Sequence, residues 1–164
     1  MKTIIFGALM GLFGGLAVFL SISLHWPGWV LFLAWVCFYL YGKSAKKALN
    51  IYLQITLGIV LAVLIELVGG FLIGAIGGLG LYVAIFFFIG SLAFLIKIKG
   101  LHDLTAWFIG LVVFFGVEPE STPIEIAHQL LLPMAAGFAF GIVVDMIVMK
   151  YVFGTGNTQG SHHG

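Results

Sequence analysis

Two carboxylates stand inside long apolar runs, where packing alone does not explain them. Glu66 lies near the end of the apolar run 50–68, and Asp145 lies toward the end of the run 126–152. A charge in the core of a bilayer costs ~2.5–3.5 kcal/mol or more, so a functional role is the first hypothesis. The two acids would then be gate carboxylates that bind protons or a cation. Because both lie close to a helix end, an interfacial position for Glu66 and pairing of Asp145 with Lys150 or another lysine are the alternatives.

Aromatic residues recur at one spacing in two short apolar segments. Residues 32–39 read FLAWVCFY, and residues 108–115 read FIGLVVFF. The spans that contain them have about 15 apolar residues each, against the ~20 that a helix needs to cross a bilayer. Paired short spans point to a central binding site, whereas an aromatic belt at the membrane interface is the alternative. The aromatic pathway candidates are Phe32, Trp35, Tyr39, Phe108 and Phe115.

His102 and Asp103 directly precede the second short span. Asp103 is expected to stabilise the N-terminus of a helix, and His102 is a further pathway candidate. The sequence contains no nucleophile elbow, HExxH motif or P-loop, and its histidines match no metal-binding spacing. We therefore expect no catalytic residues, no metal and no cofactor, and predict that the protein is not an enzyme.

The composition places all of these residues in a membrane. The 164 residues are 62% hydrophobic and only 8% charged, against about 25% charged residues in a soluble domain. The single cysteine, Cys37, excludes a disulfide within the chain, and the net charge of +1 gives no indication of nucleic-acid binding. The bilayer is therefore the expected solvent of an integral membrane protein.

Polar breaks divide the chain into six apolar spans of an all-α integral membrane protein. Pro27 and Pro123 are placed where helices begin, and Pro133 is expected to kink the last span. Residues 1–153 are predicted to form a single transmembrane domain, and residues 154–164 a disordered polar tail. The expected spans are approximately 3–24, 30–42, 50–68, 71–96, 101–117 and 126–152.

The lysines predict the orientation of these spans. All seven basic residues are lysine, and each lies before or after a span so that one side of the membrane receives them all. Lysine is enriched in cytoplasmic loops. Both termini are therefore predicted inside the cell, with the acidic loop 117–125 and a tight Gly69–Gly70 turn outside.

The two halves, 1–70 and 71–153, share a pattern. Besides the aromatic segments, Gly58 precedes Glu66 by the same interval that separates Gly137 from Asp145. Three spans in each half would place the halves in opposite orientations, as in the inverted repeats of transporters. Similar composition without a repeat is the alternative.

Small residues recur at every fourth position in three spans, so each set forms one smooth helix face. In lipid such faces let helices approach closely, and space for a pore is the alternative. The glycines expected to pack are Gly7, Gly11, Gly15, Gly70, Gly74, Gly78, Gly137 and Gly141.

Three runs carry a resemblance to a known family: GLFGGLAVFLSISLHWPGWVLFLAWVCFYLYG, WFIGLVVFFG and PMAAGFAFGIVVD. They resemble the YcdZ-like group of small bacterial inner-membrane proteins, which carries a domain of unknown function. The resemblance implies an all-helical fold in the bacterial inner membrane. It implies no activity and no site residues.

Three functions follow as hypotheses. The first is a channel or facilitator for a small neutral polar solute, because an aromatic, nearly uncharged path cannot repay the desolvation of an ion. The second is a proton-coupled transporter that uses Glu66 and Asp145. The third is a membrane subunit that packs with a partner and transports nothing. The expected partners are the lipid bilayer, the solute and further copies of the chain, and no nucleic acid.

Overall fold

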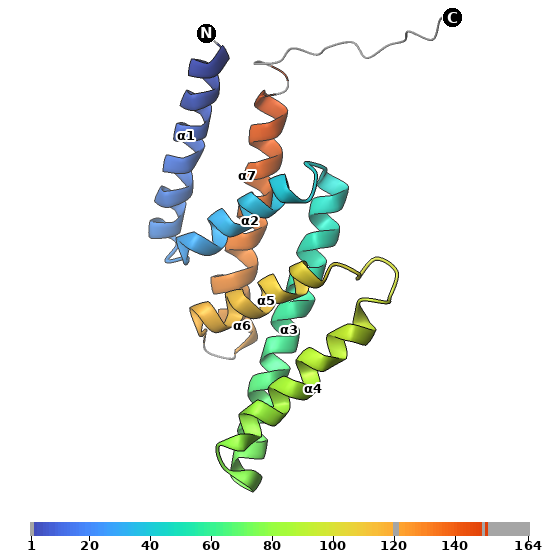
Figure 1. The fold of residues 1–164 in the computed structure, drawn as a ribbon. Coiled ribbons are helices and arrows are strands. Elements are labelled where there is room, and N and C mark those ends of the chain that lie inside the picture. Colours follow the sequence, from blue (N-terminus) through green and yellow to red (C-terminus); the bar gives the residue numbers. More distant parts are fainter. Residues whose placement is uncertain (1, 120–121, 149, 151–164) are drawn as a thin grey trace, which may run out of the picture.

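The computed structural model describes residues 2–119, 122–148 and 150 (Figure 1). The described residues form helices joined by turns and loops, and none of them lies in a strand. The tail 154–164 lies outside this part of the chain. The helices are α1 (Lys2–Ser23), α2 (Gly28–Leu40), α3 (Ala45–Ile76), α4 (Leu79–Leu95), α5 (Leu104–Val117), α6 (Pro123–Ile126), the π-helical segment η1 (Ala127–Leu131) and α7 (Leu132–Val148).

Three helical stretches are long and apolar enough to cross a membrane. They are Thr3–Ser23, Ala45–Ile76 and Ile124–Val148, and α2, α4 and α5 are shorter apolar helices. The 13 residues of α2 and the 14 residues of α5 agree with the short spans expected from the sequence. The chain is therefore a helical membrane protein.

The turn between the third and fourth spans lies further along the chain than predicted. Helix α3 continues through Gly69 and Gly70, and the chain turns at Gly77, whose φ of 70° favours glycine. A Cβ atom at Gly69 would lie 2.9 Å from the Leu81 side chain, so this glycine lets α4 pack on α3. The predicted turn at Gly69–Gly70 is thus wrong, and the boundary of the halves at 70–71 falls inside α3.

Pro133 distorts the last span, although the chain is still helical at residue 133 itself. The Leu132 N–H donates to the Ala127 carbonyl, five residues back, and residues Ala127–Leu131 form a π-helical turn. Because proline lacks an N–H and its ring crowds the preceding turn, a widened turn accommodates it. The expected distortion therefore lies on the N-terminal side of Pro133.

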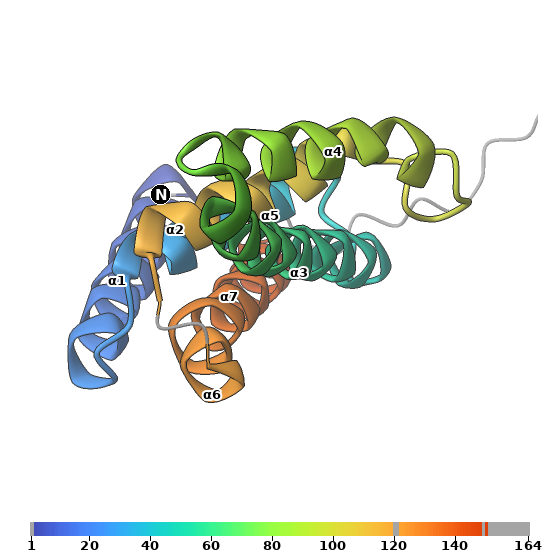
Figure 2. The ribbon, with the colours of Figure 1, turned by 90° about the horizontal axis from the view of Figure 1, so that it is seen from below.

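Helix α3 packs closely against α5 and α4, and α2 packs closely against α7. Figure 2 shows α3 between α4 and α7. The main core contains side chains of α2, α3, α5 and α7, among them Phe38, Ile55 and Met134. Among the α1 residues whose burial the structure describes, only Ala17 and Ser21 are buried, and the helix contacts the rest through a smaller cluster around Trp35.

The ends of the helices alternate between two sides of the molecule. In Figure 1 the N-terminal end of α1, the α2–α3 and α4–α5 connections and the C-terminal end of α7 lie along one slanted edge, from the top to the right. The α1–α2 and α3–α4 connections and the C-terminal end of α5 lie on the opposite, lower-left side. Every described lysine belongs to a segment on the first edge, which we call the lysine side.

Candidate functional site

Three cavities follow α5 from one end to the other. The lysine-side cavity, of about 550 Å³, lies where α3 and α5 begin. The middle cavity, of about 270 Å³, lies between α4 and α5. The acidic cavity, of about 390 Å³, lies at the C-terminal end of α5. Phe115 lines both the middle and the acidic cavities, so these two are neighbours.

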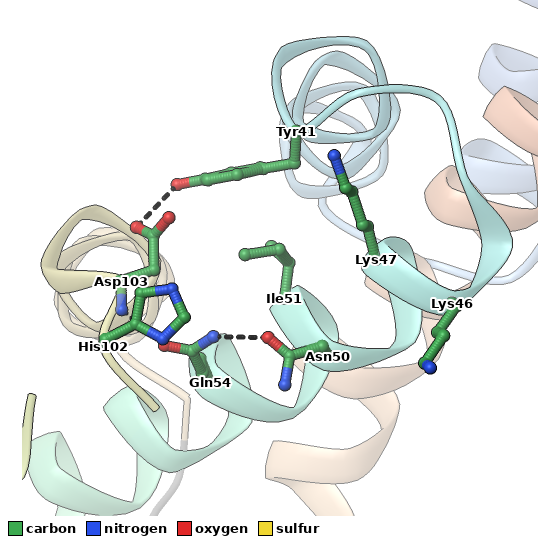
Figure 3. Close-up of a pocket in the computed structure, with 8 residues that line it drawn as sticks. All are labelled: Tyr41, Lys46, Lys47, Asn50, Ile51, Gln54, His102 and Asp103. Atoms are coloured by element: carbon green, nitrogen blue, oxygen red, sulfur yellow. Dashed lines mark hydrogen bonds between the residues drawn. The ribbon is translucent and has the colours of Figure 1, made fainter. Parts of the chain in front are cut away.

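A hydrogen-bond network forms one wall of the lysine-side cavity (Figure 3). Gln54 is fully buried. Its Nε2 donates to Asn50 Oδ1 over 2.7 Å, and its Oε1 accepts the Asp103 backbone N–H over 2.9 Å. Asn50 Nδ2 in turn donates to the Gly100 carbonyl over 2.9 Å. Because a buried amide requires partners, this network fixes the α4–α5 connection against α3.

Asp103 is the acidic member of this network. Its Oδ1 accepts the Ala106 backbone N–H over 3.0 Å, which confirms the prediction that it stabilises the start of a helix. The same oxygen accepts the Tyr41 hydroxyl over 3.2 Å.

The free polar groups of the lysine-side cavity lie on its rim. Figure 3 shows the Lys47 side chain rising from α3 toward Tyr41, while Lys46 points away from Tyr41. His102 lies in front of Gln54 and is exposed. The apolar side chain of Ile51 lies between the two walls. The cavity therefore combines an apolar floor with amide, hydroxyl and cationic groups.

The middle cavity is apolar and the acidic cavity is mixed. The middle cavity is lined by Ile65, Ile85, Ile89, Phe108, Leu111, Val112 and Phe115. The acidic cavity is lined by Glu66, Gly70, Ile73, Leu81, Phe114, Phe115, Glu118 and Pro119. The cavities along α5 are thus polar at both ends of the helix and apolar between them.

Close backbone contacts join two helix pairs in the same way. A Cβ atom at Gly58 would clash with the Trp107 carbonyl and lie 3.1 Å from the Gly110 Cα, where α3 crosses α5. A Cβ atom at Gly137 would clash with the Leu31 carbonyl and lie 2.8 Å from the Ala34 Cβ, where α7 crosses α2.

The contacted residues occupy matching places in the two aromatic segments. Leu31 and Trp107 each precede the first phenylalanine of a segment, and Ala34 and Gly110 are the small residues at its third position. Both crossings therefore use equivalent residues.

A family described as "Protein of unknown function (DUF1097)" matches residues 8–149. The chain belongs to this family. The DUF1097 match includes the three cavities and both glycine crossings. No curated protein and no solved structure matches the chain.

Four pathway candidates of this DUF1097 member lie on the cavities along α5. His102 lines the lysine-side cavity, Phe108 and Phe115 line the middle cavity, and Glu66 and Phe115 line the acidic cavity. Glu66 is exposed on α3 in the single chain. The structure thus brings the second aromatic segment and Glu66 into one region.

The other four candidates lie on the α2–α7 pair of the DUF1097 chain. Trp35 is buried and stacks with Phe32 at a ring-centroid distance of 6.0 Å. Asp145 Oδ1 lies 3.8 Å from Lys43 Nζ, and this Nζ is 5.2 Å from the centre of the Tyr39 ring. Asp145 therefore pairs with a lysine, which was one alternative from the sequence. None of the four lines the cavities along α5.

The glycines of the DUF1097 chain fall into two groups. Gly137 and Gly141 lie in close contacts with α2, as expected for helix packing. The other six expected packing glycines have open space where a Cβ would be, so they do not pack against another helix of the same chain. They are Gly7, Gly11, Gly15, Gly70, Gly74 and Gly78. The recurrence of small residues predicts a smooth helix face, but it does not predict whether another helix of the same chain packs against that face.

Sequence reasoning missed the polar network. Asn50 and Gln54 are one helical turn apart at the start of an apolar run, and this spacing was the available signal. Tyr41 was missed as well, because its partner Asp103 is distant in the sequence. Among the described residues, no three His, Cys, Asp or Glu side chains are grouped as a metal site.

Proposed function

We propose that the protein is a channel or facilitator for a small neutral polar solute, which passes along α5 between the lysine-side and acidic cavities. One observation carries this proposal: three cavities follow the same helix, polar at both ends and apolar in the middle. The free polar groups on the rim of the lysine-side cavity suit a solute that forms hydrogen bonds. The middle cavity offers an ion nothing in return for its lost hydration, which favours a neutral solute.

The proposed topology has six spans, with both termini in the cytoplasm. The alternation of helix ends in Figure 1 supports it, because all lysine-bearing segments lie on one side. An inverted repeat of α1–α3 and α4–α7 is part of the proposal. The equivalent contacts of Gly58 and Gly137 support the repeat, because a two-fold axis in the membrane plane would relate the α3–α5 crossing to the α7–α2 crossing.

Cysteine labelling tests this topology. In a Cys37→Ala background, we expect a membrane-impermeant thiol reagent outside the cell to label Glu118→Cys but not Lys46→Cys. Both side chains are exposed in the structure, so burial does not hide either position. Labelling of position 46 in intact cells would contradict the proposed orientation.

Solute flux into proteoliposomes tests the function. We expect the protein to accelerate the uptake of small neutral solutes such as urea, glycerol or acetamide, measured by stopped-flow light scattering against protein-free liposomes. A pH gradient should leave the rate unchanged, because a facilitator moves the solute without a coupled proton. A protein without transport activity, such as a subunit that only binds a partner, would give the rate of the protein-free liposomes for every solute.

The two acids test the proton-coupled alternative. Asp145 pairs with Lys43, whereas Glu66 lines a cavity on α5, so the two carboxylates do not share a cavity. We therefore expect Glu66→Gln and Asp145→Asn, which keep side-chain shape and remove charge, to change solute flux less than about twofold. Flux that depends on a pH gradient, and loses that dependence in both variants, would replace the facilitator by a coupled transporter.

We also propose that copies of the chain associate in the membrane. Open space at Gly7 and Gly74, together with strongly exposed aromatic side chains such as Phe71 and Phe86, leaves smooth apolar surface for another helix. The mass of the protein in lipid nanodiscs measures this, and a strictly monomeric mass would contradict it. The bacterial inner membrane, and the narrower YcdZ-like assignment, rest on the resemblance of the sequence runs.

A further inference from the structure

The lysine-side cavity has more cationic than anionic groups free to bind a ligand. Its one carboxylate, Asp103, already accepts the Tyr41 hydroxyl and the Ala106 N–H at the start of α5. Within the described part of the chain, neither Lys46 nor Lys47 forms an ion pair. Lys46 and Lys47 contribute one positive charge each and Asp103 one negative charge, so with His102 neutral the cavity lining has a formal charge of +1.

The start of α3 adds to this positive potential. Helix N-termini carry a partial positive charge, which acidic residues in the first turn normally offset. The first turn of α3 contains Lys46 and Lys47 and no acidic residue, and the Ser44 side chain makes no capping hydrogen bond. Two lysines and an uncapped helix start thus meet at one cavity, an arrangement that an anion would stabilise.

We infer that the lysine-side cavity binds a phosphate group, carried by an anionic phospholipid or by free phosphate. Lys47 is the principal ligand because it rises toward Tyr41 across the cavity, and Lys46 contributes from the rim (Figure 3). His102, which also lines the cavity, adds an imidazole N–H donor. A volume of about 550 Å³ accommodates a phosphate with bound water or a lipid headgroup.

This binding does not depend on the proposed transport function, although it would affect it. A phosphate group in the lysine-side cavity occupies one end of the proposed solute path and should slow flux. Binding and flux are therefore measured separately, so that failure of one does not decide the other.

The test uses the full-length protein in nanodiscs of phosphatidylcholine, with inorganic phosphate, sodium acetate or phosphatidylglycerol added in separate arms. We expect thermal stabilisation by phosphate, or retention of phosphatidylglycerol in native mass spectrometry, with affinity reduced about tenfold in Lys47→Gln, the scale of one charge-assisted hydrogen bond. Lys46→Gln should have a smaller effect in the same direction. Lys97→Gln is the matched control, because Lys97 is exposed on the lysine side but does not line the cavity.

The separate arms of the experiment distinguish free phosphate from a lipid headgroup as the ligand. An effect of inorganic phosphate assigns the site to a soluble ligand, and an effect of phosphatidylglycerol alone assigns it to a lipid headgroup. Equal binding of acetate would overturn the assignment to phosphate. Equal loss of affinity in Lys47→Gln and Lys97→Gln, or no binding in any arm, would overturn the site.

Discussion

Alanine in place of Gly110 is expected to destabilise the protein by about 3 kcal/mol, the upper range for overpacking a core, or to prevent folding. A Cβ at this position would clash with the Ile55 carbonyl and lie 2.7 Å from the Gly58 Cα. These neighbours are backbone atoms of a packed helix, so they cannot move aside as a flexible side chain can. The loss would appear as a lower melting temperature in detergent and as poor insertion during expression.

The same argument predicts matched effects at Gly58 and Gly137. Each glycine lies where its helix crosses a short helix, directly against a backbone carbonyl oxygen. This oxygen belongs to Trp107 at Gly58 and to Leu31 at Gly137. Gly58→Ala and Gly137→Ala should therefore destabilise the protein by similar amounts. Gly14→Ala and Gly90→Ala are the controls, since a Cβ at either position meets nothing within 4 Å and neither glycine supports the proposed association of copies. Melting temperatures that fall as far in the controls as at the crossings would contradict the packing described for α3–α5 and α7–α2.

The helical class and the short spans follow from the sequence because they depend on composition and run length. The position of the turn between the third and fourth spans does not follow from the sequence. Gly69–Gly70 reads as a turn, but glycine in a membrane helix also marks a close helix contact, and here Gly69 accommodates Leu81. The turn itself required a residue with positive φ, which Gly77 supplies. Local sequence does not distinguish these two uses of glycine.

Part of the candidate site was visible in the sequence and part was not. Phe108 and Phe115 were selected because their segment is short and aromatic, and they line the middle cavity. Phe32 and Trp35 were selected for the same reason but lie in a different environment, where Trp35 is buried in a small cluster beneath α1. Equivalent sequence positions therefore do not imply equivalent surroundings, because α4 packs tightly on α3 whereas α1 contacts α7 only lightly.

The polar network could not be derived from sequence alone. Gln54 and Asp103 are far apart along the chain, and their hydrogen bond depends on how the α4–α5 connection returns to the start of α3. The pairing of Asn50 with Gln54 within one helix was accessible from their spacing. The hydrogen bond from Asn50 to the Gly100 carbonyl, in contrast, depends on the fold and could not be predicted.

Blocking the middle cavity tests the proposed path along α5 most directly. Val112 lines this cavity and is 59% exposed in the single chain, so a cysteine there can be labelled in detergent with a bulky methanethiosulfonate reagent before reconstitution. Val18 on α1, 47% exposed and outside the cavities along α5, is the matched control position. The measurement compares solute flux into proteoliposomes made from labelled and from unlabelled protein, in a Cys37→Ala background. If solute passes along α5, flux through Val112→Cys should fall about tenfold or more on labelling, because passage depends on path diameter, and flux through Val18→Cys should not change. Unchanged flux in fully labelled Val112→Cys would contradict the path.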